Sequence, residues 1–119
     1  MLVTKKLVMT KDIGCNDNLF GGNIMQWADE CAAIYAMEYT GEPRMVTLKF
    51  EEMLFKSPVK VGEIIDFNAS ALVEGETSFK FHITANVGNR LVLSVDCVFV
   101  CVDQLGRKKA IEKFKRSNK

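Results

Sequence analysis

The sequence of 119 residues has only 2 prolines, 1 histidine and no strong excess of either charge, and each shortage excludes a class of protein. Scarce proline, without any run of serine, glutamine or glycine, argues against intrinsic disorder. A formal net charge of +1 gives no general attraction to nucleic acid or to an anionic membrane, so neither is expected as a partner. Any anionic ligand must be held by a local group of basic side chains.

Long apolar segments and paired cysteines are also missing. No stretch approaches the ~18 consecutive apolar residues of a membrane span, and the first residues lack the apolar core of a signal peptide. The 4 cysteines include no Cys-x-x-Cys pair, and His82 is not near two cysteines in the sequence. We therefore expect a cytoplasmic protein with free thiols and no metal site.

Apolar residues make up 48% of the chain, which is enough for the core of a single domain spanning residues 1–119. Residues 20–39 are apolar almost throughout and are followed by Gly41 and Pro43, which predicts a helix buried on most of its surface. Apolar alternation or apolar runs elsewhere predict strands. The expected strands are residues 2–9, 46–54, 65–73, 79–87 and 91–102. Residues 108–119 are expected to be a frayed basic tail.

Short turns join the last four of these strands, which indicates hairpins and an antiparallel sheet. A single apolar helix beside such a sheet has to be covered by it. The sequence therefore predicts an α+β fold in which an antiparallel five-stranded sheet wraps around a central helix.

Asp29 is the unusual residue of the apolar helix, because burying an unpaired carboxylate is costly. Two interpretations remain open. Asp29 and its neighbour Glu30 occupy the one solvated stripe of the helix, or one of the two carboxylates faces a cleft and acts on a substrate.

The start of the same helix, Asn18 to Gly22, is the second candidate. The first amides of a helix have no intrahelical acceptor, and they can polarise a carbonyl group. A plain loop-to-helix junction explains the glycines equally well. Asp29 is two turns, or roughly 10 Å, farther along, so one helix alone does not hold a compact site, and a second protomer could supply the missing wall.

The run from Asn18 to Asp29 is similar to the N-x-F-G-G-x-x-M-x-x-x-D signature of hotdog-fold acyl-CoA thioesterases of the YciA and cytosolic brain acyl-CoA hydrolase type. Residues 46–63 resemble the strand of that family that leads to F-x-x-P-V-x-V-G-D/E. Weaker matches follow in the same order at residues 75–78 and 99–107. Asp17 and Glu52 stand where glycine is common in the family.

The resemblance implies the hotdog fold and the hydrolysis of an acyl-CoA to a free acid and CoA. CoA is part of the substrate, so no cofactor is expected. The site is implied to lie between two protomers of a homodimer, alone or within a trimer of dimers. Asp29 of one protomer would act as general base or as nucleophile, and Asn18 of the other would hold the water or the carbonyl. The backbone at Gly21 and Gly22 would polarise that carbonyl.

Further contacts to the substrate are predicted from the same matches and from charge. Thr47 and Ser78 lie in the matched motifs, although each would also serve as an ordinary solvated strand residue. Arg44, Arg107 and Lys108, with Lys109 beside them, could bind the phosphates of CoA or simply be solvated.

Two other functions of the same fold remain as alternatives. An enoyl-CoA hydratase or dehydratase usually needs a histidine near the helix, and the helix and its loop contain none. A non-catalytic module that only binds acyl-CoA would usually carry a DNA-binding segment, for which the chain has no room.

Overall fold

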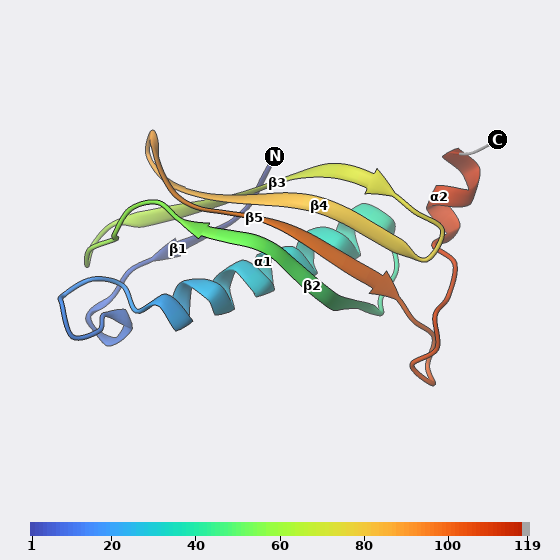
Figure 1. Cartoon of the computed structure of the whole chain (residues 1–119), viewed down its shortest axis with the longest axis horizontal. Coiled ribbons are helices and arrows are strands. Elements are labelled where there is room, and N and C mark those ends of the chain that lie inside the picture. Colours follow the sequence, from blue (N-terminus) through green and yellow to red (C-terminus); the bar gives the residue numbers. More distant parts are fainter. Residues whose placement is uncertain (118–119) are drawn as a thin grey trace.

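One curved sheet and one long helix make up most of the computed structural model, which describes residues 1–117 (Figure 1). The five strands are antiparallel and lie in the order β1-β3-β4-β5-β2, so β1 and β2 are the edges of the sheet. Their bounds are β1 Leu2–Leu7, β2 Met45–Phe55, β3 Ile64–Glu74, β4 Ser78–Val87 and β5 Arg90–Cys101.

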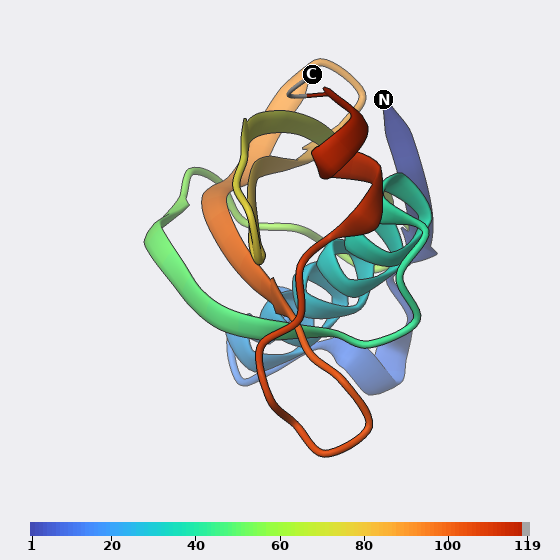
Figure 2. The same cartoon turned by 90° about the vertical axis from the view of Figure 1, so that its right-hand side faces the viewer.

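Helix α1 (Gly21–Thr40) lies along the concave face of the sheet, which curls around it (Figure 2). Three alanines, Ala28, Ala32 and Ala36, are completely buried on the face toward the sheet, and their small side chains let the helix approach closely. The predicted architecture, a five-stranded antiparallel sheet wrapped around a central helix, is confirmed. Within residues 1–117, neither helix is both long and apolar enough to cross a membrane.

Strand periodicity builds the other half of the core. In β4, Phe79, Phe81, Ile83 and Ala85 are fully buried, whereas the residues between them are half-buried. The ring of Tyr39 stacks on Phe79 with 4.7 Å between centroids. The alternation predicted from the sequence is therefore observed, and it places the buried side chains of β4 between the sheet and the helix.

The prediction that the helix is buried on most of its surface is wrong for a single chain. Met25, Ile34 and Met37 of α1 are 46%, 39% and 41% exposed. The helix is apolar on sides that its own sheet does not cover. One chain alone therefore leaves apolar helix surface in contact with water.

The expectation of a frayed tail is wrong for residues 108–117. Lys108 bridges to Val102, and the short helix α2 covers Glu112–Ser117. Ile111 and Phe114 are 0% and 1% exposed, because they pack against the end of the core near α1. Because lysines surround these two apolar residues, the sequence shows no apolar pattern that would indicate their burial. Residues 118–119 lie outside the described part of the chain.

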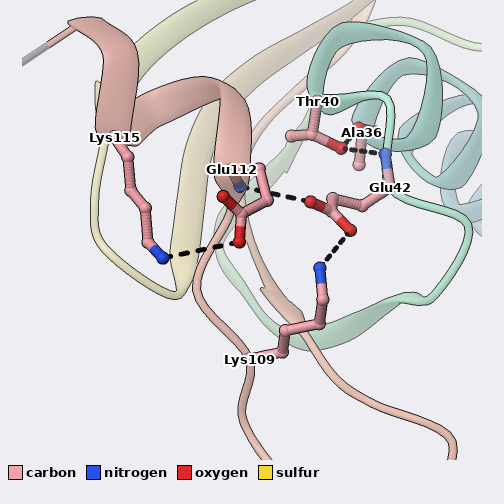
Figure 3. A network of polar contacts seen from close by, with 6 residues as sticks. All are labelled: Ala36, Thr40, Glu42, Lys109, Glu112 and Lys115. Atoms are coloured by element: carbon pink, nitrogen blue, oxygen red, sulfur yellow. Dashed lines mark hydrogen bonds and ion pairs between the residues drawn. The ribbon is translucent and has the colours of Figure 1, made fainter.

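The carboxylate of Glu42 attaches α2 to the C-terminal end of α1 (Figure 3). It accepts hydrogen bonds from Lys109 Nζ at 2.7 Å and from the backbone amide of Glu112 at 3.2 Å. The hydroxyl of Thr40 accepts from the Glu42 amide and donates to the carbonyl of Ala36. The hydrogen bond from Lys109 is the main reason that the pKa of Glu42 lies below its usual value.

Replacing this carboxylate with a neutral amide should weaken the attachment of α2. We expect Glu42→Gln to lower the free energy of unfolding at pH 7 by about 1–3 kcal/mol, since hydrogen bonds to a charged group are lost. The pKa of Glu42 is lowered from 4.5 on folding, so its contribution is complete above that pH and disappears as the pH falls through the folded pKa. The difference from wild type should therefore shrink toward acid pH.

Urea denaturation at a series of pH values measures this difference. Glu38→Gln, a change at an exposed carboxylate of α1, is the matched control and should have little effect. Equal losses in the two variants, or a loss that is independent of pH, would contradict the role of Glu42.

Candidate active site

The segment that leads into α1 is tied to its neighbours on both sides. Ile13 and Leu19 form an isolated antiparallel bridge, and the amide of Gly14 donates to the Asn18 carbonyl at 2.8 Å. The amide of Leu19 donates to the carbonyl of Val59 at 2.7 Å. These bonds form a small, closed loop that presents Asn18 at the N-terminal end of the helix.

A pocket of about 400 Å³ lies between this loop, the first turn of α1 and the segment that follows β2. Asn18 and Gly21 both line it. Its apolar walls are Leu19, Ile24, Phe55, Pro58, Val59 and Val92. The Oδ1 atom of Asn18 is buried and has no hydrogen-bond partner within residues 1–117. The pocket thus combines an apolar wall with the carboxamide of Asn18 and the backbone of the helix start.

Gly22 does not line this pocket, and its lack of a side chain serves the ring of Phe20. A β-carbon on Gly22 would lie 2.8 Å from Cε2 of Phe20, which is too close for any real contact. A β-carbon on Gly14 would lie 3.3 Å from Cδ1 of the same ring. Phe20 therefore packs in the space left by two glycines and supports the loop from outside.

Asp29 lies on an exposed part of α1, close to strand β2. Its Oδ1 atom accepts a hydrogen bond from the hydroxyl of Thr47 at 3.0 Å, so the structure brings these two predicted residues together. Asp29 is not among the residues that line the pocket of Asn18. Within one chain, the two predicted catalytic side chains therefore belong to separate places.

The loop before α1 lies at one end of the molecule, and the segments that follow α1 and β5, which contain the basic candidates, lie at the other end (Figure 1). Arg44 helps to line a hollow of about 260 Å³ together with Asp103 and Lys109. Arg107 pairs with Asp103 at 3.3 Å, and Lys108, which bridges to Val102, is exposed. Ser78 begins β4 opposite Val100 and is half-buried. These residues do not contact Asn18 or Asp29 in the same chain.

Three of the four cysteines, Cys31, Cys97 and Cys101, are buried and offer no nucleophile. Burial raises the pKa of Cys31 to about 11 and is the largest cause that raises the pKa of Cys97 to about 12. Cys101 is buried as well, and its pKa is also raised by burial. A thiol must ionise before it attacks a carbonyl, so these three remain unreactive near neutral pH.

Two residues have a backbone conformation that favours glycine. The φ angle is 59° at Asp17 and 44° at Glu52, in the left-handed region. These are the two positions at which the matched signature commonly has glycine. Asp17 directly precedes Asn18, so the left-handed turn directs the chain toward the pocket. Sequence reasoning recognised these positions but not their backbone conformation.

Comparison with known proteins relates this arrangement to a family. The model of the thioesterase superfamily matches residues 16–93. A protein of Haemophilus influenzae that is named an uncharacterized acyl-CoA thioester hydrolase is 32% identical over 93% of this chain and 77% of its own length. The acyl-CoA thioester hydrolase YciA of Escherichia coli is 37% identical, and the match spans 69% of this chain but only 61% of that protein.

Solved structures show the same fold at 27–28% identity. The hexameric thioesterase y2039 of Yersinia pestis superposes with a TM-score of 0.88, at 28% identity, over 93% of this chain and 94% of its own. An acyl-CoA hydrolase of Staphylococcus aureus superposes with a TM-score of 0.80, at 27% identity, over 91% of this chain and 69% of its own. It was solved with an aspartate, an asparagine or a threonine replaced by alanine. The predicted hotdog fold is confirmed, and the chain belongs to the thioesterase superfamily.

Proposed function

We propose that this protein hydrolyses the thioester bond of an acyl-CoA, at a site that two copies of the chain build together. The observation that carries the proposal is the pair formed by Asp29 and Thr47 on the uncovered side of α1. A carboxylate with a hydroxyl donor, on apolar surface that needs a partner, suits a site between subunits. The named activity of the relatives supports the same reaction.

The residues divide the chemistry between them. Thr47 donates to Oδ1 of Asp29, which orients the carboxylate and leaves Oδ2 to accept a proton from water or to attack the carbonyl carbon. The carboxamide of Asn18 and the first amide of α1, at Gly21, both belong to residues that line the pocket, and they would stabilise the negative charge that develops on the carbonyl oxygen. A thioester is already activated, so these few groups suffice.

A second copy is needed to bring Asp29 and Asn18 together. Strand β2 is an edge of the sheet, and its Val46 and Leu48 are 46% and 59% exposed. Exposed apolar edge strands readily pair with another strand. If a twofold axis beside β2 relates two copies, their α1 helices are antiparallel. The Asn18 pocket of one copy then lies near the Asp29 region of the other. Three relatives of known structure are described as hexameric, and we propose a trimer of such dimers.

The same dimer carries the basic far end of one chain toward the pocket of the other. Arg44, Arg107 and Lys108 would then bind the phosphates of CoA, and Ser78 would contact the substrate nearby. The S. aureus relative has been solved in complex with CoA. We also propose the cytoplasm as the compartment, since the described cysteines are free thiols.

Replacing Asp29 tests the chemistry directly. We expect Asp29→Asn to fold normally and to lower kcat by at least ~100-fold, because the general base or nucleophile is lost. Release of free CoA thiol from a panel of acyl-CoAs measures the rate. Glu30→Gln, at the neighbouring exposed carboxylate of the same helix, is the matched control and should keep its activity. Full activity in a folded Asp29→Asn protein would rule out the assignment.

The position of the asparagine needs its own test. In the S. aureus hydrolase, the replaced asparagine lies fifteen positions before the replaced aspartate. Asn18 lies only eleven positions before Asp29, and a count of fifteen ends at Gly14, with Asn16 between the two. Asn18 lines the pocket and Asn16 is exposed, which favours Asn18.

We expect Asn18→Ala to lower kcat by about 10–1000-fold. The loss of one oxyanion donor usually lowers kcat by about 100–1000-fold. Asn16→Ala should remain close to wild type in the same assay. The opposite pattern, with the loss confined to Asn16→Ala, would move the donor to the tip of the loop. An effect of Asn18→Ala on KM alone would make Asn18 a binding residue.

A substitution at the edge of the sheet tests the assembly of copies without changing a proposed catalytic residue. Leu48→Lys places a charge on exposed β2, so we expect it to weaken pairing between copies and to lower activity with the size of the particle. Light scattering on a sizing column measures the mass of the particle. Leu72→Lys, at a similarly exposed leucine of β3, is the control and should keep both. A fully active monomer would show that one chain holds a complete site.

A further inference from the structure

One backbone carbonyl connects the Asn18 loop to the first turn of α1. The carbonyl of Asp12 accepts a hydrogen bond from the amide of Phe20 at 3.0 Å and a second one from Nδ2 of Asn23 at 2.9 Å. Phe20 is the N-terminal cap of α1, and Asn23 is its third residue. The carbonyl therefore holds the end of the loop and the start of the helix at one point.

Asp12 is held in place by bonds that do not involve the Asn18 loop. It ends a short 3₁₀ helix (Thr10–Asp12) and is 5% exposed. Its Oδ2 atom accepts a hydrogen bond from the amide of Met9 at 2.9 Å, and this bond is the main cause that lowers the pKa of the carboxyl group. The acceptor that Asn23 uses is thus part of a rigid, buried turn.

The Asn23–Asp12 bond closes a ring of chain that contains Asn18, Gly21 and Gly22. Within residues 1–117, the amide of Phe20 makes the only other hydrogen bond to this carbonyl, so the side chain of Asn23 adds a second bond to one backbone bond. Asn23 does not line the Asn18 pocket, so its carboxamide does not reach a ligand there. Any influence of Asn23 on a substrate must pass through the position of the loop.

We infer that Asn23 is a positioning residue for the thioester hydrolysis proposed above, on which this inference rests. Its carboxamide holds the loop against the helix, so that the side chain of Asn18 and the backbone of Gly21 keep their positions in the same pocket. Donors that stabilise a developing charge act only when they are held in place before the reaction. A displacement of about 1 Å can lower the rate about 100-fold.

The identity of residue 23 supports a need for a donor. An acidic residue in the first turn of a helix interacts favourably with the helix dipole, so aspartate would stabilise α1 at this position better than asparagine does. A carboxylate, however, has no hydrogen to donate to the Asp12 carbonyl. The first turn of α1 contains no acidic residue, and Asn23 gives up the favourable charge while keeping the N–H group.

This conflict provides a sharp test. We expect Asn23→Asp, which has nearly the same shape, to lower kcat by between about 10-fold and 100-fold while KM changes much less. Its free energy of unfolding should stay close to that of wild type, because the favourable interaction of the new charge with the helix dipole offsets the lost hydrogen bond. Thiol release and urea denaturation on the intact oligomer give the two readings.

Two companion variants separate the donor from the charge. Asn23→Ala removes the N–H group without adding a charge, and it should lose kcat to a similar degree. Asn89→Asp makes the same change of charge at the exposed β4–β5 hairpin, and it should behave as wild type. Full activity of Asn23→Ala, or a loss of activity in step with a loss of stability, would overturn the positioning role.

The result also distinguishes this inference from the proposed function. Wild-type protein that releases no thiol from any acyl-CoA would refute the hydrolysis itself. Wild-type protein that releases thiol, together with an equally active Asn23→Asp variant, would leave the hydrolysis intact and refute the role of Asn23.

Discussion

The packing of α1 into the concave sheet is the constraint on which the rest of the molecule depends. Ala28, Ala32 and Ala36 are completely buried where the helix meets the sheet, and aromatic side chains of β4 fill the space on that side. Close packing of this kind leaves little freedom to rotate the helix. The direction of every other helix residue follows from it, including the outward direction of Asp29 and the exposure of Met25 and Met37.

That direction explains why the proposed site is divided between chains. Helix α1 turns its small residues to its own sheet and leaves Met25, Ile34 and Met37 uncovered, and β2 is one of the two edges at which the sheet ends. Asp29 lies on this uncovered side with Thr47, whereas Asn18 is held at the helix start. One association along β2 would cover the apolar surface and also bring the two parts of the site together.

Periodicity was sufficient to predict the helix, the five strands and their antiparallel arrangement. The continuous apolar segment of the helix and the alternation of the strands both indicate which residues are buried. It failed where burial is local or depends on another chain. Ile111 and Phe114 are two apolar residues among lysines, too few to form a pattern, yet they anchor α2. Of the candidate site, the sequence identified Asp29, Asn18 and Thr47 through a motif. The hydrogen bond from Asn23 to a distant backbone carbonyl has no counterpart in any pattern of side chains.

Several interactions, each weak by itself, together fix the conformation of the loop before α1. Asp17 adopts a left-handed conformation that costs a non-glycine residue free energy, and this turn sends Asn18 toward the pocket. Such a conformation persists only where neighbouring hydrogen bonds enforce it. Here these bonds are donated by the Gly14 amide or accepted by the carbonyls of Val59 and Asp12. A loop held in this way can present a polar side chain without a larger core around it, and its accuracy then depends on each of these few bonds.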